Sequence, residues 1–368
     1  MLGCLEIGGA EQQAFLLARF LKEKCGAYVE IWGVAHGGKL TSKCDKFGIP
    51  WRILGNPLSG TFVSTVVKLL GISWSFRRAN ADIVLPYTLV PNVISGITWR
   101  LGGAKLCVWN QRDEGTEGHR EPFERWAVRL TPMFFANSRA GADYVIGSLC
   151  VDSQKVTVVH NGIALEKPQE TRSVCRQQLG ISDSSVCVAM IANLSDKKDH
   201  VTLINAWSKV LKELLPAAGR LKLLLAGRYD NASRNIIELV GVLKISEYVT
   251  FLGPVDDIAG LLQAVDIGVY SSISEGLPNG VIECMAAGKA IVASDIPGIR
   301  EAVGDGYTLL SKPRDSDEMA SHLITLINNP ILRKDIGLRN MERALALFDT
   351  VTMCNKITEK LNGYLMYS

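Results

Sequence analysis

The chain has 368 residues, of which 47% are hydrophobic and 21% charged, and its formal net charge is +3. This length predicts two domains, each able to bury a core, and the small charge gives no indication of a nucleic-acid partner. The longest uncharged stretch, Ile83 to Trp99, contains two prolines and is a poor membrane-spanning candidate. Nine scattered cysteines without a C-x-x-C pair, and no recognisable secretory signal, predict a cytoplasmic protein.

The first half of the chain alternates short apolar runs with amphipathic segments. Gly8 and Gly9 lead into a helix expected over 10–24, so the strand before them is very short unless the true start of the chain lies upstream. Thr61 to Ala79 predicts a helix that carries apolar and basic residues and that either covers a sheet or rests on a membrane surface. Strands are expected at 28–35, 48–54, 81–87, 105–110, 133–138 and 155–163, and a further helix at 121–130.

The second half repeats this alternation after a polar segment, 164–173, which is the expected linker. We expect domains at 1–165 and 174–345, with a C-terminal helix of about 346–368 that can pack back on the first domain. Strands are expected at 186–192, 221–227, 248–253, 266–271, 290–294 and 307–310, and helices at 200–215, 258–264, 316–328 and from 331 to about 361. The alternation predicts an α/β fold of two tandem Rossmann-like domains, whose parallel sheets face across a cleft.

The stretch from Ser274 to Gly288, S-E-G-L-P-N-G-V-I-E-C-M-A-A-G, follows an apolar strand and predicts strand, turn and helix. Asn279 is the expected N-cap and Gly288 the residue that ends the helix. Glu275 would then lie at the carboxyl end of a strand and Glu283 one helical turn in. Such a pair suits a sugar ring and a vicinal diol, while the amides at the helix start suit a phosphate. The alternative is an ordinary capped turn with two solvated acids.

Other candidates are weaker by themselves. Lys198 follows the first strand of the second domain and could pair with a phosphate, or it belongs to a solvated charged loop. Arg112 and Asp113 follow a strand of the first domain and could touch an acceptor, or they form a surface ion pair. The five histidines show no ligand spacing, so no metal site is predicted, and His200 is expected to be structural. The loop at Gly8 lacks the G-x-G-x-x-G pattern of dinucleotide enzymes.

Taken together, these segments resemble a known family. E-G-L-P-N-G-V-I-E-C-M-A-A-G-K-A-I-V-A-S-D-I-P-G-I-R-E is similar to the characteristic segment of the retaining glycosyltransferases of family 4, which have the GT-B fold. V-T-F-L-G-P-V-D-D, G-G-A-E, F-F-A-N-S-R-A-G-A-D and V-T-V-V-H-N-G-I resemble other segments of that family. The resemblance covers nearly the whole chain, is dense from 248 to 303, and is thinner from 28 to 110.

The resemblance implies transfer of a sugar from a nucleotide-sugar donor, most plainly a UDP-sugar, with retention of anomeric configuration and without a metal or other cofactor. It implies that Glu275 faces the donor sugar, that Lys198 binds phosphate, and that Glu283 holds the ribose diol. The other positions implied to touch the donor are Gly8, Gly9, Asn193, Phe251, Leu252, Gly276, Leu277, Pro278, Asn279, Gly280 and Val281.

Three departures from the family pattern stand out. Asn193 replaces an arginine expected five residues before Lys198, so one cation is missing or comes from elsewhere, such as Arg112. A histidine expected in the first domain has no counterpart, and the matching loops carry Tyr87 and Asn110. The first strand is missing or very short. Tyr87, Arg112 and Asp113 are therefore the acceptor-side candidates.

The sequence thus predicts a glycosyltransferase that acts on a glycan or lipid-linked acceptor in surface polysaccharide or glycoconjugate biosynthesis. It would work in the cytoplasm, where it can also contact the inner face of the membrane. Two alternatives stay open, namely a nucleotide-sugar epimerase or hydrolase on the same fold and a non-catalytic, nucleotide-binding partner of a glycan-assembly complex.

Overall fold

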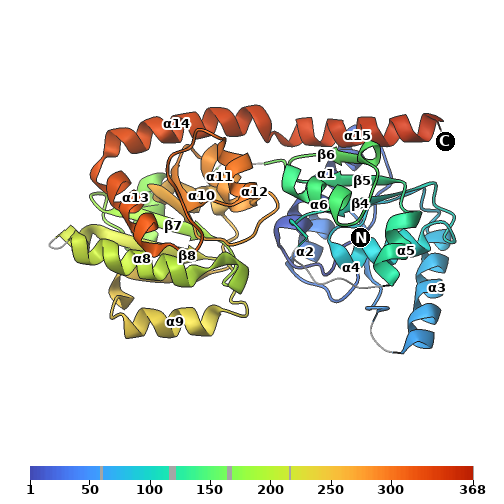
Figure 1. The fold of residues 1–368 in the computed structure, drawn as a ribbon, viewed down its shortest axis with the longest axis horizontal. Coiled ribbons are helices and arrows are strands. Elements are labelled where there is room, and N and C mark those ends of the chain that lie inside the picture. Colours follow the sequence, from blue (N-terminus) through green and yellow to red (C-terminus); the bar gives the residue numbers. More distant parts are fainter. Residues whose placement is uncertain (59–60, 116–121, 164–167, 215–216, 368) are drawn as a thin grey trace. The chain divides into compact units, whose positions relative to one another are not determined.

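The computed structural model describes residues 1–58, 61–115, 122–163, 168–214 and 217–367. The chain forms two compact units, one of Met1–Gly162 with Thr350–Ser368 and one of Ile163–Asp349 (Figure 1). Both are α/β, and every strand pairing that the structure records is parallel, as the alternating pattern predicts. No helix in the described part of the chain is long and apolar enough to cross a membrane.

The first unit contains a two-stranded and a four-stranded parallel sheet, ordered β1-β2 and β3-β4-β5-β6. Its strands are β1 Ile31–Gly33, β2 Trp51–Ile53, β3 Ile83–Val84, β4 Leu106–Gln111, β5 Met133–Ala136 and β6 Val156–Val158. Its helices are α1 Gly9–Cys25, α2 Lys39–Lys46, α3 Phe62–Arg78, α4 Leu89–Thr98, α5 Phe123–Leu130, α6 Arg139–Gly147 and α15 Thr350–Tyr367.

The first residues of the chain join these two sheets. Leu2 bridges to Gly33 of β1, and its amide donates to the carbonyl of Trp32 at 2.8 Å. On the other side, the Met1 ammonium donates to the carbonyl of Leu85 at 2.7 Å, and the Tyr87 amide donates to the carbonyl of Met1 at 2.9 Å. The expected very short first strand is therefore present as this bridge. It joins the β1-β2 sheet and the β3-β4-β5-β6 sheet into one continuous layer.

The second unit has a six-stranded parallel sheet of order β12-β11-β10-β7-β8-β9. Its strands are β7 Val186–Ile191, β8 Leu221–Ala226, β9 Val249–Gly253, β10 Ile267–Tyr270, β11 Ala290–Ser294 and β12 Leu310–Ser311. Its helices are α7 Arg172–Gln178, α8 His200–Glu213, α9 Ser233–Val242, α10 Ile258–Ala264, α11 Asn279–Ala286, α12 Pro297–Val303, α13 Ser316–Asn328 and α14 Pro330–Leu347. The strand order runs outward from β7 in one direction and then from β10 in the other, so the switch point lies between β7 and β10.

The predicted element types are confirmed, and several predicted bounds are wrong. The strand expected at 81–87 is shorter, and only β3 is a regular strand. After it, Leu85 and Tyr87 are hydrogen-bonded to Met1, and Tyr87 forms an isolated bridge with Asn110. The helix expected from 331 to about 361 is two helices, α14 and α15, which end and begin at either side of Phe348 and Asp349. Residues 164–167 of the expected linker, and residues 121 and 215 of two expected helices, lie outside the described residues.

The rest of the expected linker belongs to the second unit. Thr171 caps α7 through its side-chain oxygen, and Arg172 donates to Asp266 at 2.6 Å and to the carbonyl of Gln263 at 2.6 Å. Arg176, fully buried, donates to the carbonyls of Ala264 and Ser182. These charge-assisted bonds fasten the segment to the residues just before β10, so its last residues, up to 173, are packed within the second unit.

Candidate donor site in the second unit

Lys198 and Glu275 meet at the switch point of the second sheet. Lys198 ends a short 3₁₀ turn, Asp196–Lys198, that follows β7, and Glu275 lies in the loop that follows β10. The ammonium of Lys198 donates to Oε1 of Glu275, and the hydroxyl of Ser272 donates to the same oxygen at 2.8 Å. Their side chains are 25% and 14% exposed, so the pair is partly withdrawn from water yet reachable. Two residues that are 77 positions apart thus form one charged site at the place where parallel sheets bind ligands.

The two loops that carry this pair are bonded to each other. The hydroxyl of Ser271 donates to the carbonyl of Lys198 at 2.9 Å, and the amide of Ile273 donates to the carbonyl of Lys197 at 2.9 Å. Tyr270, at the end of β10, donates its hydroxyl to the carbonyl of Gly280 at 2.5 Å, and burial raises the pKa of this tyrosine well above its usual value. The phenol is therefore neutral, and it connects the end of β10 to the first turn of α11.

The N-cap of α11 is Pro278, and the prediction of Asn279 is wrong. The backbone of Pro278 is extended, with φ −75° and ψ 116°, and its carbonyl accepts from the amide of Ile282 at 3.3 Å, which defines the cap position. Because proline has no side-chain acceptor, the first turn of α11 has no side-chain cap. At the other end Gly288 is confirmed as the left-handed residue: its φ is +71°, and the amides of Gly288 and Lys289 return to Met285 and Cys284.

Two glycines allow the close packing around this loop. A Cβ on Gly280 would lie 2.5 Å from the carbonyl oxygen of Ile191, so α11 begins directly against the end of β7. A Cβ on Gly298 of α12 would lie 1.9 Å from the carbonyl oxygen of Gly276 and 2.5 Å from that of Glu275. Sequence reasoning assigned no role to Gly298, although it belongs to the segment P-G-I-R-E that carried part of the family resemblance.

The remaining predicted donor residues are distributed around this site. Glu283 is partly exposed, one turn into α11, while Gly276, Leu277 and Pro278 are buried, as suits residues that offer backbone groups. Phe251 and Leu252 are half-buried in β9, two strands from β7, where they pack against different core clusters. The positions still predicted to touch the donor through their backbone are Asn279, Gly280 and Val281, which open α11.

Asn193 holds a loop together. Its side-chain oxygen accepts from the amide of Arg228 at 3.1 Å, and the amide of Leu194 donates to the carbonyl of Arg228 at 2.9 Å. Gly227, just before, has φ +157°, and a Cβ there would lie 2.1 Å from the carbonyl oxygen of Ala192. The ends of β7 and β8 are thus clamped together, with the backbone of Arg228 bonded to the side chain of Asn193.

His200, the first residue of α8, is buried with 1% of its surface exposed, and neither ring nitrogen has a hydrogen-bond partner among the described residues. Burial lowers its pKa to about 4, and the nearby ammonium of Lys198 acts in the same direction. The imidazole is therefore neutral at physiological pH, which agrees with a structural histidine. The N-cap of α8 is Asp199, whose carboxylate accepts from the hydroxyl of Thr202 at 2.6 Å; sequence reasoning did not identify this cap.

The acceptor-side candidates form a separate group in the first unit. Arg112 donates to the side-chain oxygen of Asn161 at 2.6 Å, and its guanidinium lies 5.4 Å from the ring centre of Tyr87. Removal from water lowers the pKa of Arg112 and raises that of Tyr87 to about 12, so the phenol is neutral. Glu11, in the first turn of α1, is close enough to stabilise this cation.

The neighbouring groups of this first-unit site also make contacts within their own loops. Asp113 accepts from the side chain of Gln111 and from the amide of Gly115, both at 2.7 Å, and so shapes its own loop. Gly8 is the N-cap of α1, and a Cβ there would lie 2.6 Å from a carboxylate oxygen of Glu11, which folds back over the helix start; Gly9 is the first helical residue. Within the described residues, no group of three or more His, Cys, Asp or Glu side chains could hold a metal ion.

The fold and this geometry define the class of protein. Two Rossmann-like α/β units in tandem, with a charged site at a switch point of the second, have the GT-B fold. A family model described as Glycosyltransferase Family 4 matches residues 7–167, and one described as glycosyl transferases group 1 matches residues 185–329. The chain belongs to this family of glycosyltransferases, as its sequence motifs indicated.

Among curated relatives, the chain is 35% identical over 158 residues to N,N'-diacetylbacillosaminyl-diphospho-undecaprenol alpha-1,3-N-acetylgalactosaminyltransferase of Campylobacter jejuni, covering 41% of each chain. It is 32% identical over 241 residues to the putative glycosyltransferase EpsD of Bacillus subtilis, covering 63% of this chain and 61% of that protein. A D-inositol 3-phosphate glycosyltransferase of Nocardia farcinica is 27% identical over 66% of this chain and 55% of its own length. The chain therefore matches less than two thirds of each of these relatives.

Solved structures share the fold over nearly the whole chain. The Anabaena protein HepE in complex with UDP-glucose has a TM-score of 0.83 and 22% identity, covering 98% of this chain and 99% of that one. Sucrose-phosphate synthase from Thermosynechococcus elongatus has a TM-score of 0.78 and 19% identity, covering 100% and 96%.

Proposed function

We propose that this protein transfers a sugar from a UDP-sugar to a lipid-linked or glycan acceptor, with retention of anomeric configuration. The observation that carries the proposal is the contact between Lys198 and Glu275 at the switch point of the second sheet. The UDP donor is supported by the complexes of the Anabaena protein with UDP and with UDP-glucose, and the lipid-linked acceptor by the name of the Campylobacter relative. A role in surface polysaccharide or glycoconjugate assembly, at the cytoplasmic face of a membrane, is part of this proposal.

In the proposed reaction the bond between the anomeric carbon and the diphosphate breaks, the acceptor oxygen bonds to that carbon on the same face, and the hydroxyl proton passes to the leaving diphosphate. Negative charge develops on the leaving diphosphate, where the ammonium of Lys198 and the uncapped first turn of α11 would stabilise it. Arg228, whose backbone is bonded to Asn193, is a second candidate for this charge in place of the arginine missing there. The carboxylate of Glu275 would stabilise positive charge on the sugar. Glu283, one turn into α11, would accept from the ribose hydroxyls.

The experiment is a donor panel with two readouts. Purified protein is incubated with UDP-, GDP- and ADP-sugars, with and without a lipid-linked acceptor extract, and both nucleoside diphosphate and glycosylated product are measured. Product from a UDP-sugar only in the presence of acceptor supports transfer. Donor conversion without acceptor would indicate an epimerase or hydrolase instead, and binding without turnover would indicate the non-catalytic partner. The anomeric configuration of the product, measured by NMR, tests retention separately.

Variants link the activity to the site. Lys198→Ala and Glu275→Gln are each expected to lower turnover by about 100-fold or more, because they remove groups that act on the charges of the transition state. Lys209→Ala is the matched control: Lys209 lies on α8 in the same unit and pairs with Asp317 at 2.6 Å. Full activity in the first two variants would show that the site is assigned to the wrong residues.

A further inference from the structure

Helix α3 has two apolar faces, and the first unit covers only one of them. Leu69, Ile72 and Phe76 are buried, and the ring of Phe76 stacks on Trp32 of β1 with centres 5.2 Å apart. The residues on the remaining surface of the helix are also large and apolar, yet exposed: Phe62 at 62%, Val63 at 71%, Val67 at 62%, Leu70 at 54% and Trp74 at 59%. Packing against the sheet therefore explains only half of the apolar pattern of this helix.

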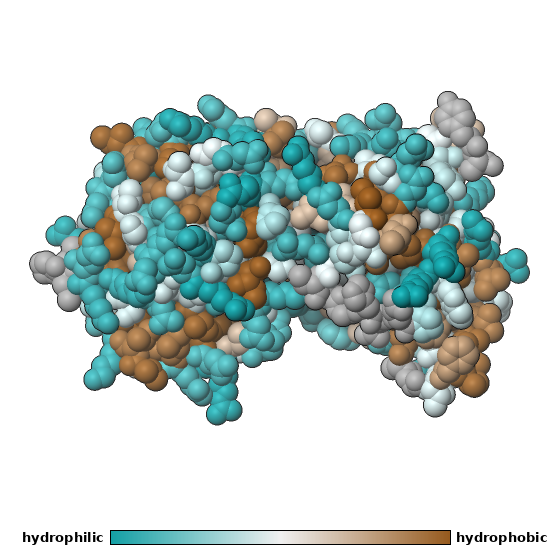
Figure 2. All heavy atoms as spheres, viewed as in Figure 1, coloured by the Kyte–Doolittle hydropathy of each residue, from teal (hydrophilic) through white to brown (hydrophobic). Residues whose placement is uncertain are grey.

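The exposed face continues onto α5. The ring of Phe62 stacks on that of Phe123 with centres 6.0 Å apart, and Trp126 meets the edge of Phe123 at the same separation. Trp126 is 48% exposed and Leu130 37%. We call these residues the α3–α5 surface: Phe62, Val63, Val67, Leu70, Trp74, Trp126 and Leu130. Figure 2 shows brown, hydrophobic side chains at the position of α3 in Figure 1, on the exterior of the first unit.

Among the described residues, the exposed charged side chains of α3 and α5 are all basic. No aspartate or glutamate occurs from Thr61 to Ala81, whereas Lys68, Arg77 and Arg78 do, and all three are exposed. On α5, Arg125 and Arg129 are exposed, while Glu124 is buried. The guanidinium of Arg78 lies 4.4 Å from the ring centre of Trp74, so a cation and an exposed indole form one unit.

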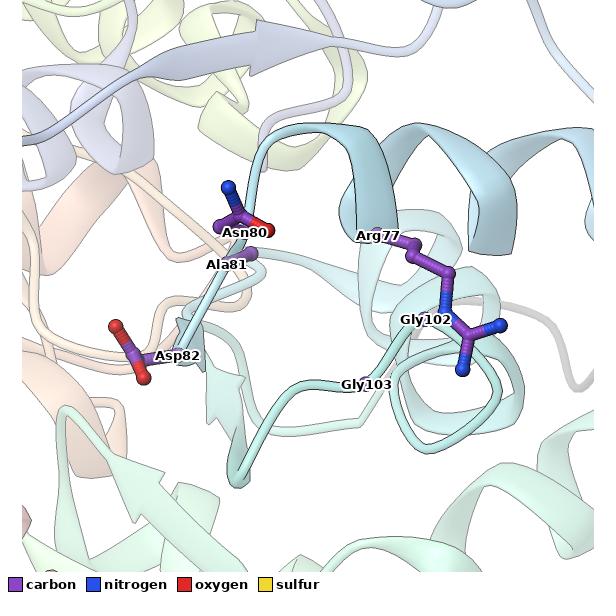
Figure 3. A pocket seen from close by; sticks show the side chains of 6 residues that line it. All are labelled: Arg77, Asn80, Ala81, Asp82, Gly102 and Gly103. Atoms are coloured by element: carbon purple, nitrogen blue, oxygen red, sulfur yellow. The ribbon is translucent and has the colours of Figure 1, made fainter.

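The C-terminal end of α3 borders a cavity of about 300 Å³ lined by Arg77, Asn80, Ala81, Asp82, Gly102 and Gly103. Figure 3 shows the side chain of Arg77 extending toward the Gly102–Gly103 turn and the carboxylate of Asp82 directed elsewhere. Asp82 accepts from the ammonium of Lys105 at 2.8 Å, and Arg77 forms no ion pair with any described residue. This end of the helix therefore presents an arginine that can take a phosphate oxygen.

We propose that the α3–α5 surface docks the protein on an anionic phospholipid bilayer. An apolar face with tryptophan and phenylalanine, bordered by lysine and arginine, has the two components that bind such a surface, namely burial in the acyl region and attraction to the headgroups. A second copy of the chain is a poorer occupant, because two such surfaces carry charge of the same sign. The inference rests on the membrane location in the proposed function and adds the surface that makes the contact, and vesicle binding tests it without donor or acceptor.

The test is sedimentation of the full chain with phosphatidylcholine vesicles, with and without phosphatidylglycerol. We expect binding to the anionic vesicles that weakens as salt is raised and little binding to the zwitterionic ones. Arg77→Ala with Arg78→Ala should weaken vesicle binding by about 25-fold, about fivefold for each basic residue near the surface. Val67→Glu with Leu70→Glu should abolish it. Val242→Glu is the matched control, because Val242 is 76% exposed but lies on α9 of the other unit.

Each variant is first shown to have the thermal unfolding midpoint of the unaltered protein, so that a loss of binding reports the surface alone. Loss of vesicle binding in the two α3 variants and not in Val242→Glu supports the proposal. No binding of the unaltered protein to anionic vesicles, or the same loss in the control, overturns it. A concentration-dependent dimer that Val67→Glu with Leu70→Glu disrupts, with vesicle binding unchanged, would overturn it as well and assign the surface to a second copy.

Discussion

Replacing Glu275 by glutamine is expected to strengthen the binding of UDP and to slow turnover at once. The ammonium of Lys198 is engaged by the carboxylate of Glu275, which also accepts from Ser272. A diphosphate must share or displace this carboxylate to reach Lys198, and the two anions repel each other. Glutamine keeps the shape and the hydrogen bond from Ser272 but removes the charge.

The size of the effect follows from the burial of the pair. Two unit charges about 4 Å apart attract by about 4 kcal/mol at an effective dielectric constant of about 20, and the cost of desolvation cancels much of this. The side chains are 25% and 14% exposed, so the interaction free energy of this pair is larger than that of a surface pair, under about 1 kcal/mol, and smaller than that of a fully buried pair. A gain of about 1–2 kcal/mol corresponds to UDP bound about 5- to 30-fold more tightly.

Isothermal titration calorimetry with UDP measures the affinity, and product formation from the UDP-sugar measures turnover. Asp317→Asn is the matched control, since it removes the carboxylate of another lysine pair of the same unit, at 2.6 Å from Lys209. Unchanged UDP affinity in Glu275→Gln would refute the idea that this pair competes with the diphosphate. Unchanged turnover would refute the catalytic assignment of Glu275, and a chain that binds no UDP would refute the donor.

Three further outcomes are expected. The folded-state pKa of His200 is about 4 against 6.5 for a free imidazole, so the unfolded chain binds more protons between these values. The free energy of unfolding should therefore fall by up to about 3 kcal/mol as pH drops from 6.5 to 4. Denaturant titrations of His200→Gln should show a weaker dependence on pH, and an equal dependence would contradict the argument. Gly298→Ala, whose Cβ would lie 1.9 Å from the carbonyl oxygen of Gly276, should lose about 1–3 kcal/mol and turnover, whereas Gly306→Ala, which meets open space, should lose neither. Dialysis against EDTA should leave turnover unchanged, and a loss that Mg²⁺ restores would show that a metal participates.

The spacing of apolar residues predicts which segments are strands and which are helices, because that spacing is a local property. The helices expected at 258–264 and 316–328 begin and end at those residues, and Gly288 ends α11 as expected. The family resemblance identifies Glu275, Glu283 and Lys198 from the motifs alone, without any distance between their side chains. The N-cap of α11 was not predicted correctly, because it is set by the last residue with an extended backbone before the helix, which is Pro278.

Contacts between these segments depend on how the chain packs in three dimensions. The strand order brings the ends of β7 and β10 together, and so places Lys198 against Glu275 although 77 residues separate them. The first residues complete a layer between Gly33 and Leu85, a pairing that no local pattern encodes. Periodicity showed that α3 is apolar, but which of its faces meets the sheet depends on the packing of Phe76 against Trp32, which leaves Val67 and Trp74 in solvent.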